Sequence, residues 1–457
     1  MPTDTANGDS RRSLWLRVRE YAVPPSMIET ATARRRTGDW AGACAAARFD
    51  VDLDLRSVAR THGRDLASRV RDDLRHLAPD LLRWHLPRIA PDGLLRPGLT
   101  VALARYGTGP GPVHLVARTA PAWADAGQRV SLALWDGARA DAGAHRHPHP
   151  HPDRRFRLDL HRHLWDVRRT GELRTRSGAA EPQAGEHRPD LPVPRHCAED
   201  RWAEEARLLF HAEGLPAGRI AIRLGARRRL VLDLAGDGAW PPVPGNARPH
   251  GPGGAAGLPV LPDAATWVPP DLELLRAGLI GADRLHPLVA EALVPRHAPA
   301  AAPPGPQDPA GRPLVVECRG ARHRIGVVDG VLVALDHDPA EVRREELLAA
   351  LSGPPLPCLA AIDRAHRHPE CLTGVGERLA HGDTAGALAV VESLLGPGAL
   401  LRDGPLRDEL ERAARQRVTY GLYRADLLGP RTDRTIPDHR RSGHHPRRPR
   451  ARRAARR

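Results

Sequence analysis

A proline-rich segment is the strongest constraint on how this chain can fold. Residues 295–313 hold seven prolines in nineteen positions. Proline lacks a backbone N–H and fixes φ at about −65°, so such a run interrupts both helices and sheets and forms a semi-extended spacer. We therefore predict a linker over 295–313, with folded regions on both sides of it.

The first part of the chain has a helical pattern. Residues 1–95 are predicted to be mostly α-helical, because their apolar residues recur at helical spacing. The expected helices lie at 9–23, 26–38 and 40–48. Ser26 stands three positions before Glu29, which is the spacing of a capping box and predicts the start of the second helix.

Short alternating runs follow and predict a β-meander over 96–175 that carries a His/Pro insertion. The expected strands lie at 99–106, 113–119, 129–135 and 156–160. A polar linker over 176–196 and a mixed α/β region over 197–294 complete the sequence before the proline-rich linker.

The last folded part is predicted to be an α+β C-terminal domain over 314–430, followed by a disordered Arg-rich tail over 431–457. The expected strands lie at 314–318, 323–328 and 331–335, and the expected helices at 339–351, 357–367, 371–381, 384–395 and 405–424. Asp338 is the expected cap of the first of these helices. The fold class of the whole chain is therefore predicted to be multidomain α+β, with a helical N-terminal region and a β-meander in the middle.

The chain contains no lysine, so all 69 of its basic residues other than histidine are arginines. This excludes the phosphate-binding lysine of a P-loop, a Schiff-base lysine and the strand lysine of a protein kinase. A composition rich in Ala, Arg, Gly and Pro is typical of a bacterium with a GC-rich genome. Runs of Arg, Pro and His can therefore reflect the genome rather than a function.

Positive charge is concentrated at the C-terminus. The formal net charge is +14, and nine of these charges belong to arginines in 440–457, a stretch without acidic residues. The nine are Arg440, Arg441, Arg447, Arg448, Arg450, Arg452, Arg453, Arg456 and Arg457. Such a tail can contact nucleic-acid phosphates without sequence preference, and it has no aromatic residue for base stacking. A solvated tail without a role is the alternative.

Four alternating histidines are the candidate metal ligands. His145, His147, His149 and His151 stand in a His/Pro run. Imidazoles can bind Ni²⁺, Cu²⁺ or Zn²⁺. However, alternate residues of an extended chain lie about 7 Å apart, too far to share one ion. We expect adventitious binding at most, and no cofactor.

Three aspartates alternate in the run Asp50, Asp52 and Asp54. An EF-hand loop starting there would need glycine at its sixth position and glutamate at its twelfth, where this chain has Leu55 and Thr61. We predict instead the polar face of a short strand, with Asp54 capping the next helix.

One short sequence occurs twice. Residues 38–45 (GDWAGACA) and 382–389 (GDTAGALA) match at six of eight positions. The pattern suits a helical hairpin, because glycine ends one helix and aspartate caps the next. Around Trp40 it resembles the turn of a tetratricopeptide hairpin, which implies a remnant peptide-binding groove. Two isolated hairpins are the other interpretation, since a solenoid needs at least three adjacent repeats.

The remaining features indicate a soluble cytoplasmic protein. Five cysteines occur without a CxxC pair, so neither a disulfide framework nor a zinc ribbon is expected. No signal peptide and no membrane span is predicted. The function predicted first is a non-enzymatic adaptor that acts through protein–protein contacts. The alternatives are a nucleic-acid-associated protein that uses its tail, and an enzyme, which a deep pocket with converging histidines and carboxylates would indicate.

Overall fold

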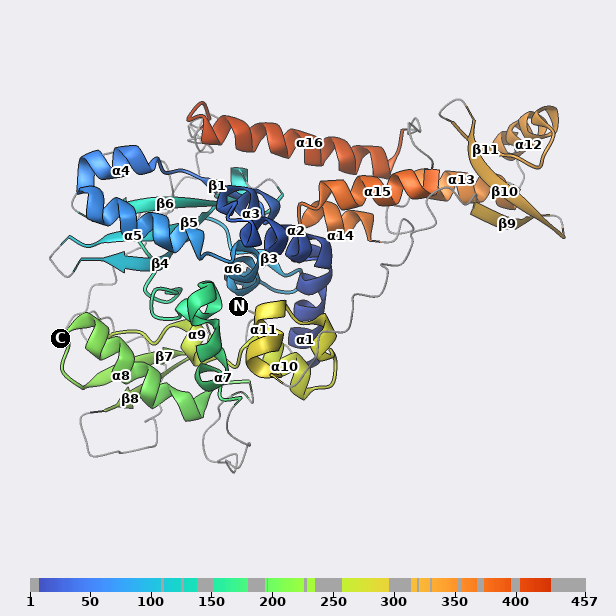
Figure 1. Ribbon diagram of the computed structural model, residues 1–457. Coiled ribbons are helices and arrows are strands. Elements are labelled where there is room, and N and C mark those ends of the chain that lie inside the picture. Colours follow the sequence, from blue (N-terminus) through green and yellow to red (C-terminus); the bar gives the residue numbers. More distant parts are fainter. Residues whose placement is uncertain are drawn as a thin grey trace, which may run out of the picture.

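The structure confirms a multidomain α+β protein. The computed structural model describes residues 8–107, 111–124, 127–137, 151–179, 194, 196–225, 228–234, 257–295, 314–318, 320–328, 331–351, 356–367, 374–395 and 403–428. The predicted tail over 431–457 and most of the two predicted linkers lie outside these ranges. We call the described residues up to 295 the body and those from 314 the arm. Figure 1 shows the first part of the arm, residues 314–367, projecting from the body. Across these ranges, no helix has both the length and the apolar character that a membrane crossing requires.

Short helices form the first part of the body, as the sequence predicts. They are α1 (Gly8–Arg17), a π-helical turn (Val18–Ala22), α2 (Pro25–Arg36), α3 (Trp40–Ala46), α4 (Leu55–His62), α5 (Arg64–Arg75) and α6 (Pro79–His85). The predicted capping box at Ser26 is wrong. Helix α2 starts one residue earlier, at Pro25, and has no side-chain cap. Proline suits the first helical position, where no N–H is needed.

A four-stranded sheet lies beside these helices, in the order β1-β6-β5-β4. Its strands are β1 (Phe49–Val51), β4 (Thr100–Tyr106), β5 (Val113–Thr119) and β6 (Val130–Asp136), with β2 (Arg88–Ile89) and β3 (Leu94–Leu95) forming a separate pair. The meander β4-β5-β6 is antiparallel as predicted, whereas β1 adds a parallel edge to β6.

The expected strand at 156–160 does not form. This segment joins β4 through only two backbone bonds, from the N–H groups of Asp153 and Leu158 to the carbonyls of Thr100 and Ala102. The side chain of Asp153 accepts a bond from the N–H of Arg155 at 2.8 Å, and this local turn competes with strand pairing. The alternation at 156–160 instead brings Phe156 and Leu158 into the core.

Two hydrophobic cores hold the body together. The first joins the N-terminal helices, the meander and the later helices α10 (Pro270–Arg276) and α11 (Pro287–Leu293). The second lies between α8 (Trp202–Glu213), α9 (Asp263–Thr266) and the hairpin of β7 (Arg219–Arg223) and β8 (Arg229–Asp233). Its centre is Trp202, which is fully buried and donates its indole N–H to the carbonyl of Thr266 at 3.1 Å.

The arm follows the sequence prediction closely. It contains β9 (Leu314–Cys318), β10 (Ala321–Val328), β11 (Val331–Ala334), α12 (Pro339–Leu351), α13 (Pro357–Arg367), α14 (Val375–Ala380), α15 (Thr384–Leu395) and α16 (Pro405–Arg424). Asp338 caps α12 as predicted, since its carboxylate accepts a bond from the N–H of Ala340 at 3.0 Å. Residues of the arm alone form the core around Ile325, Ile362 and Leu406.

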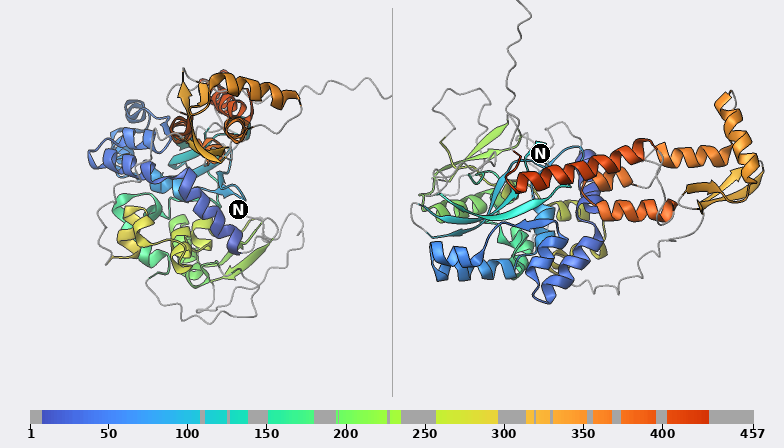
Figure 2. Two further views of the ribbon diagram at one scale, coloured as in Figure 1. Left: turned by 90° about the vertical axis from the view of Figure 1, so that its right-hand side faces the viewer. Right: turned by 90° about the horizontal axis from the view of Figure 1, so that it is seen from above.

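Helix α16 returns from the arm to the body, as Figures 1 and 2 show. The Tyr420 hydroxyl donates to the Asp50 carboxylate at 2.6 Å, and Arg424 donates to Asp52 at 2.8 Å. The ring of Tyr423 meets Trp123 edge-on, with 5.3 Å between centroids. The first two aspartates of the alternating run therefore hold the last helix of the arm.

The third aspartate of that run acts as predicted. Asp54 accepts bonds from the N–H groups of Arg56 and Ser57, at 3.1 and 2.9 Å, and so caps α4. The backbone hydrogen bonds to Arg56 and Ser57 also lower the pKa of Asp54.

The repeated Gly-Asp sequence forms the same turn in both places. Asp39 accepts a bond from the N–H of Gly42 at 2.8 Å, and Asp383 accepts one from Gly386 at 3.2 Å. A Cβ on Gly42 would come within 2.1 Å of the Asp39 carboxylate, and one on Gly386 within 2.2 Å of Asp383. In both places a side chain on this glycine would force the capping carboxylate to shift, so the glycine suits the position that the aspartate takes here.

The two hairpins also contact each other across the body and the arm. Arg48, which follows α3, donates to the carbonyl of His381 at 2.6 Å and to Asp383 at 3.3 Å. The ring of Tyr21 stacks on His381 with 6.2 Å between centroids. The second hairpin therefore forms part of the joint between the arm and the body.

Candidate functional site

A cavity of about 130 Å³ is the candidate binding site in the body. It lies among α1, the segment after α6, and the residues that surround α9. Its apolar lining consists of Leu14, Trp15, Leu86, Pro87, Val101, Phe156, Leu158, Leu164, Ala264, Trp267, Val268, Pro269 and Pro270. The volume is close to that of an engineered protein cavity, roughly 150 Å³, that binds benzene. The space fits one small, largely apolar ligand.

The charged groups at this cavity already have partners. Arg11 bonds to Glu273 at 2.9 Å, and its guanidinium lies 5.7 and 5.6 Å from the ring centres of Trp15 and Trp267. Asp263 bonds to Arg155 at 2.7 Å. Burial raises the pKa of Asp263, and the Arg155 charge opposes that rise. These pairs leave the lining without a strong preference for a charged ligand.

His85 and Trp15 carry the polar groups of the cavity lining that can serve a ligand. The Nε2 atom of His85 and the indole nitrogen of Trp15 are buried and have no hydrogen-bond partner among the described residues. Burial, together with the nearby His286 and Arg88, lowers the pKa of His85 to about 3. The imidazole is therefore neutral at physiological pH and offers a ligand one hydrogen bond. One histidine, His85, and one carboxylate, that of Asp263, line this cavity, and the carboxylate is paired with Arg155.

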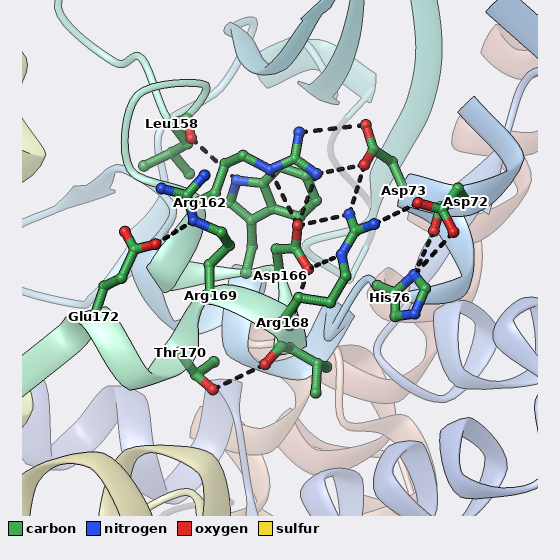
Figure 3. Close-up of polar contacts among 12 residues, drawn as sticks. Asp72, Asp73, His76, Leu158, Arg162, Asp166, Arg168, Arg169, Thr170 and Glu172 are labelled. Carbon is green, nitrogen blue, oxygen red and sulfur yellow. Dashed lines mark hydrogen bonds and ion pairs between the residues drawn. The ribbon is translucent and has the colours of Figure 1, made fainter. Parts of the chain in front are cut away.

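A dense ionic network lies on another side of the body, and Figure 3 shows its geometry. Asp166 is fully buried and accepts bonds from Arg162 at 2.7 Å and from Arg168 at 2.8 Å. Both arginines also bond to Asp73 of α5, and the hydroxyl of Tyr106 on β4 donates to the same carboxylate at 2.7 Å.

This network of arginines and aspartates holds two segments of the body together. Burial alone would raise the pKa of Asp73, but hydrogen bonds from Arg162 and Tyr106 outweigh it, and the pKa is lowered. Burial would likewise raise the pKa of Asp166, but hydrogen bonds from Arg168 and Arg162 outweigh it and lower the pKa. Both carboxylates therefore remain ionised and paired with arginine. These pairs join α5 to the turn after Trp165, and neither carboxylate is presented as a reactive group.

A second buried carboxylate joins the two cores. Glu205 of α8 accepts two bonds from Arg176, both 2.5 Å long, and one contact from His161 at 3.2 Å. Burial opposes ionisation, yet the hydrogen bonds from His161 and Arg176 lower the pKa of Glu205 to about 2. The neighbouring His163 is buried, and this burial lowers its pKa well below the ordinary value.

Most of the site residues predicted from sequence lie outside the described residues. This applies to His145, His147 and His149, and to all nine arginines of the predicted tail. His151 is described, is exposed, and packs edge-on against Trp135 with 5.7 Å between centroids. The cavity and its His85 were missed by sequence reasoning, because a single histidine in a helical stretch carries no distinguishing pattern.

Comparisons with protein-family models, with curated proteins and with solved structures found no match for this chain.

The buried Glu205 makes a testable contribution to stability. Its pKa is lowered from 4.5 to about 2 in the folded state. The stabilisation is therefore complete above pH about 4.5 and is lost as the pH falls through about 2. We expect the stability difference between the wild type and Glu205→Gln to shrink by roughly 3 kcal/mol between pH about 6 and pH about 2. Urea denaturation across this range measures it.

Glu204→Gln is the matched control, because Glu204 is on the same helix but its side chain is 60% exposed. Its effect on the unfolding free energy should change little with pH. A constant difference between the wild type and Glu205→Gln would show that Glu205 is not held ionised by Arg176 and His161.

Proposed function

We propose that this chain is a non-enzymatic adaptor that acts through protein–protein contacts made by its arm. The observation that carries the proposal is the distribution of exposed apolar side chains. Eight of the thirteen large apolar residues that are exposed among the described residues belong to the arm. The eight are Val315, Leu335, Leu347, Leu388, Val418, Leu422, Leu427 and Leu428.

The architecture supports this proposal in two ways. The arm has its own core, its first part projects from the body, and α16 lies on the outside of the body, so the outer surfaces of the arm are accessible to another molecule (Figures 1 and 2). Exposed apolar side chains that gather in one part of a protein are typical of interaction surfaces. The ionic clusters of the body, in contrast, are closed by arginine–carboxylate pairs.

We further propose that the protein acts in the cytoplasm. The supporting observation is that four of its cysteines are free and buried, namely Cys44, Cys197, Cys318 and Cys358. Free thiols persist in a reducing compartment.

Substitutions on the arm test the adaptor proposal. Leu347 and Val418 are 66% and 65% exposed, so Leu347→Asp and Val418→Asp should leave the fold intact. If these side chains contact a partner, recovery of that partner should fall about tenfold, since losing one central apolar contact costs more than about 1 kcal/mol. Quantitative mass spectrometry of proteins that co-purify with each variant from native cells measures the change.

Leu279→Asp is the control, because Leu279 is 42% exposed but belongs to the body. Proteins recovered with the wild type and this control, but not with the arm variants, would support the proposal. Equal recovery of partner proteins with Leu347→Asp, Val418→Asp and Leu279→Asp would contradict the proposal. Absence of any specific partner of the wild type would also contradict it.

Nucleic-acid association through the tail is the alternative proposal. It is supported by the nine arginines of 440–457, which carry most of the net charge of +14. Binding to duplex DNA or RNA should then weaken by at least about 10³ between about 50 and 200 mM salt. Replacing all nine arginines by glutamine should abolish binding, whereas replacing them by lysine should preserve it, because phosphate contacts of this kind depend on charge. Absence of nucleic-acid binding at low salt would eliminate this alternative, and so would binding that is unaffected when the nine arginines are replaced by glutamine.

A further inference from the structure

Two cysteines and one histidine of the arm meet at one point. Cys318 ends β9, His337 lies in the turn between β11 and α12, and Cys358 is in the first turn of α13. The ligand atoms of these three side chains all lie within 4.8 Å of one another. Three separate elements thus bring two sulfur atoms and one imidazole nitrogen together.

This point is buried and contains an unsatisfied polar atom. Both cysteines are fully buried, and the side chain of His337 is 5% exposed. The Nε2 atom of His337 has no hydrogen-bond partner among the described residues. Because a buried polar atom without a partner is costly, the arrangement favours a bound species that pairs with this nitrogen.

The surroundings of His337 suit a metal ligand. Its Nδ1 atom lies 3.8 Å from the carboxylate of Glu341, whereas its Nε2 atom has no partner among the described residues and is the candidate ligand atom. A carboxylate near the second ring nitrogen is common for histidines that bind metals. The ring of His323 stacks on His337 at 4.2 Å between centroids, and its buried Nδ1 atom also has no partner among the described residues.

We propose that Cys318, His337 and Cys358 bind one zinc ion. Zinc binds thiolates at about 2.3 Å and imidazole at about 2.0–2.1 Å, so its tetrahedral ligand atoms stand about 3.5–3.8 Å apart. The observed group reaches these separations by a contraction of at most about 1.3 Å. Each cysteine releases its thiol proton to solvent on binding, and the two thiolates neutralise the Zn²⁺ charge inside the protein.

The zinc ion has a structural role in this part of the arm. The core here is small, with four buried residues: Cys318, Ala334, Leu356 and Cys358. A core of this size provides little hydrophobic stabilisation, and small folded units often use a metal to compensate. The ion would join the end of β9 to the turn after β11 and to the start of α13. The ring of His323 stacks on that of His337 and so shields this part of the site.

Metal analysis of the full chain tests the proposal. The protein is expressed with zinc supplementation and purified under reducing conditions, in a background in which His145, His147, His149 and His151 are replaced by asparagine. We expect about one zinc per chain. Cys358→Ser and His337→Gln should lower the occupancy at least about tenfold after dialysis, because each removes one of only three protein ligands. Cys197→Ala, which changes a buried cysteine of the body, should retain the zinc.

Cobalt substitution gives a second measurement that does not depend on the variants. Co²⁺ bound to Cys318 and Cys358 should produce thiolate-to-cobalt charge-transfer bands, which a site made only of imidazoles cannot produce. If the variants fail to fold, this spectrum of the parent protein decides the question. Less than about one-tenth zinc per chain after reconstitution, absence of the thiolate bands, or a disulfide between Cys318 and Cys358 would overturn the proposal.

Discussion

Pairing between arginine and carboxylate is the interaction on which the arrangement of this protein depends. Arginine presents a planar fork that binds a carboxylate through two hydrogen bonds, and it stays charged when buried. In a chain without lysine, arginine is the permanently charged basic side chain available for such pairs. It joins elements that are distant in sequence, as in Arg19 with Asp271 at 3.1 Å and Arg176 with Glu205 at 2.5 Å. The order of helices and strands along the chain does not determine how they pack together. These arginine–carboxylate pairs help to fix the positions of the helices and strands relative to one another.

The same pairing occupies the polar clusters of the body, so the candidate binding surfaces lie elsewhere. The conspicuous polar clusters of the body are occupied by arginine, so they position segments and offer no free reactive group at the carboxylates of Asp73 and Asp166. The body contains a small apolar cavity with buried nitrogens on His85 and Trp15 that have no partner among the described residues and that a ligand could contact. The arm offers apolar side chains to a larger partner. This contrast is the physical basis for proposing an adaptor.

Local features of the fold were predictable from sequence, and distant ones were not. The Asp338 cap marks the start of α12, and this helix forms over the predicted residues. The parallel pairing of β1 with β6 was not predictable, because it joins residues about eighty positions apart through a contact without a turn signal. The alternation at 156–160 suggested a strand, but side-chain turns there form in its place.

The candidate sites also depend on contacts between residues that are distant in the sequence, and these contacts were not predictable. The Asp50 and Asp52 carboxylates were recognised as the polar face of a strand, but nothing in their spacing indicated a helix beginning more than 350 residues later. The group of Cys318, His337 and Cys358 has none of the short spacings that identify common zinc sites, so only the folded arm brings it together. Sequence patterns detect ligands that are neighbours along the chain, and these are not.

Hydrogen exchange in helix α16 tests most directly whether carboxylate contacts hold the arm on the body. Asp50→Asn removes the charge that Tyr420 and Arg129 bind, whereas Asp54→Asn alters the same run without touching α16. If these contacts hold α16 on the body, exchange near Tyr420 should be at least about tenfold faster in Asp50→Asn, because a hydrogen bond to a charged group contributes about 1.5–3 kcal/mol. Asp54→Asn should affect only α4. Unchanged protection of α16 in Asp50→Asn would show that the Asp50 carboxylate does not hold this helix.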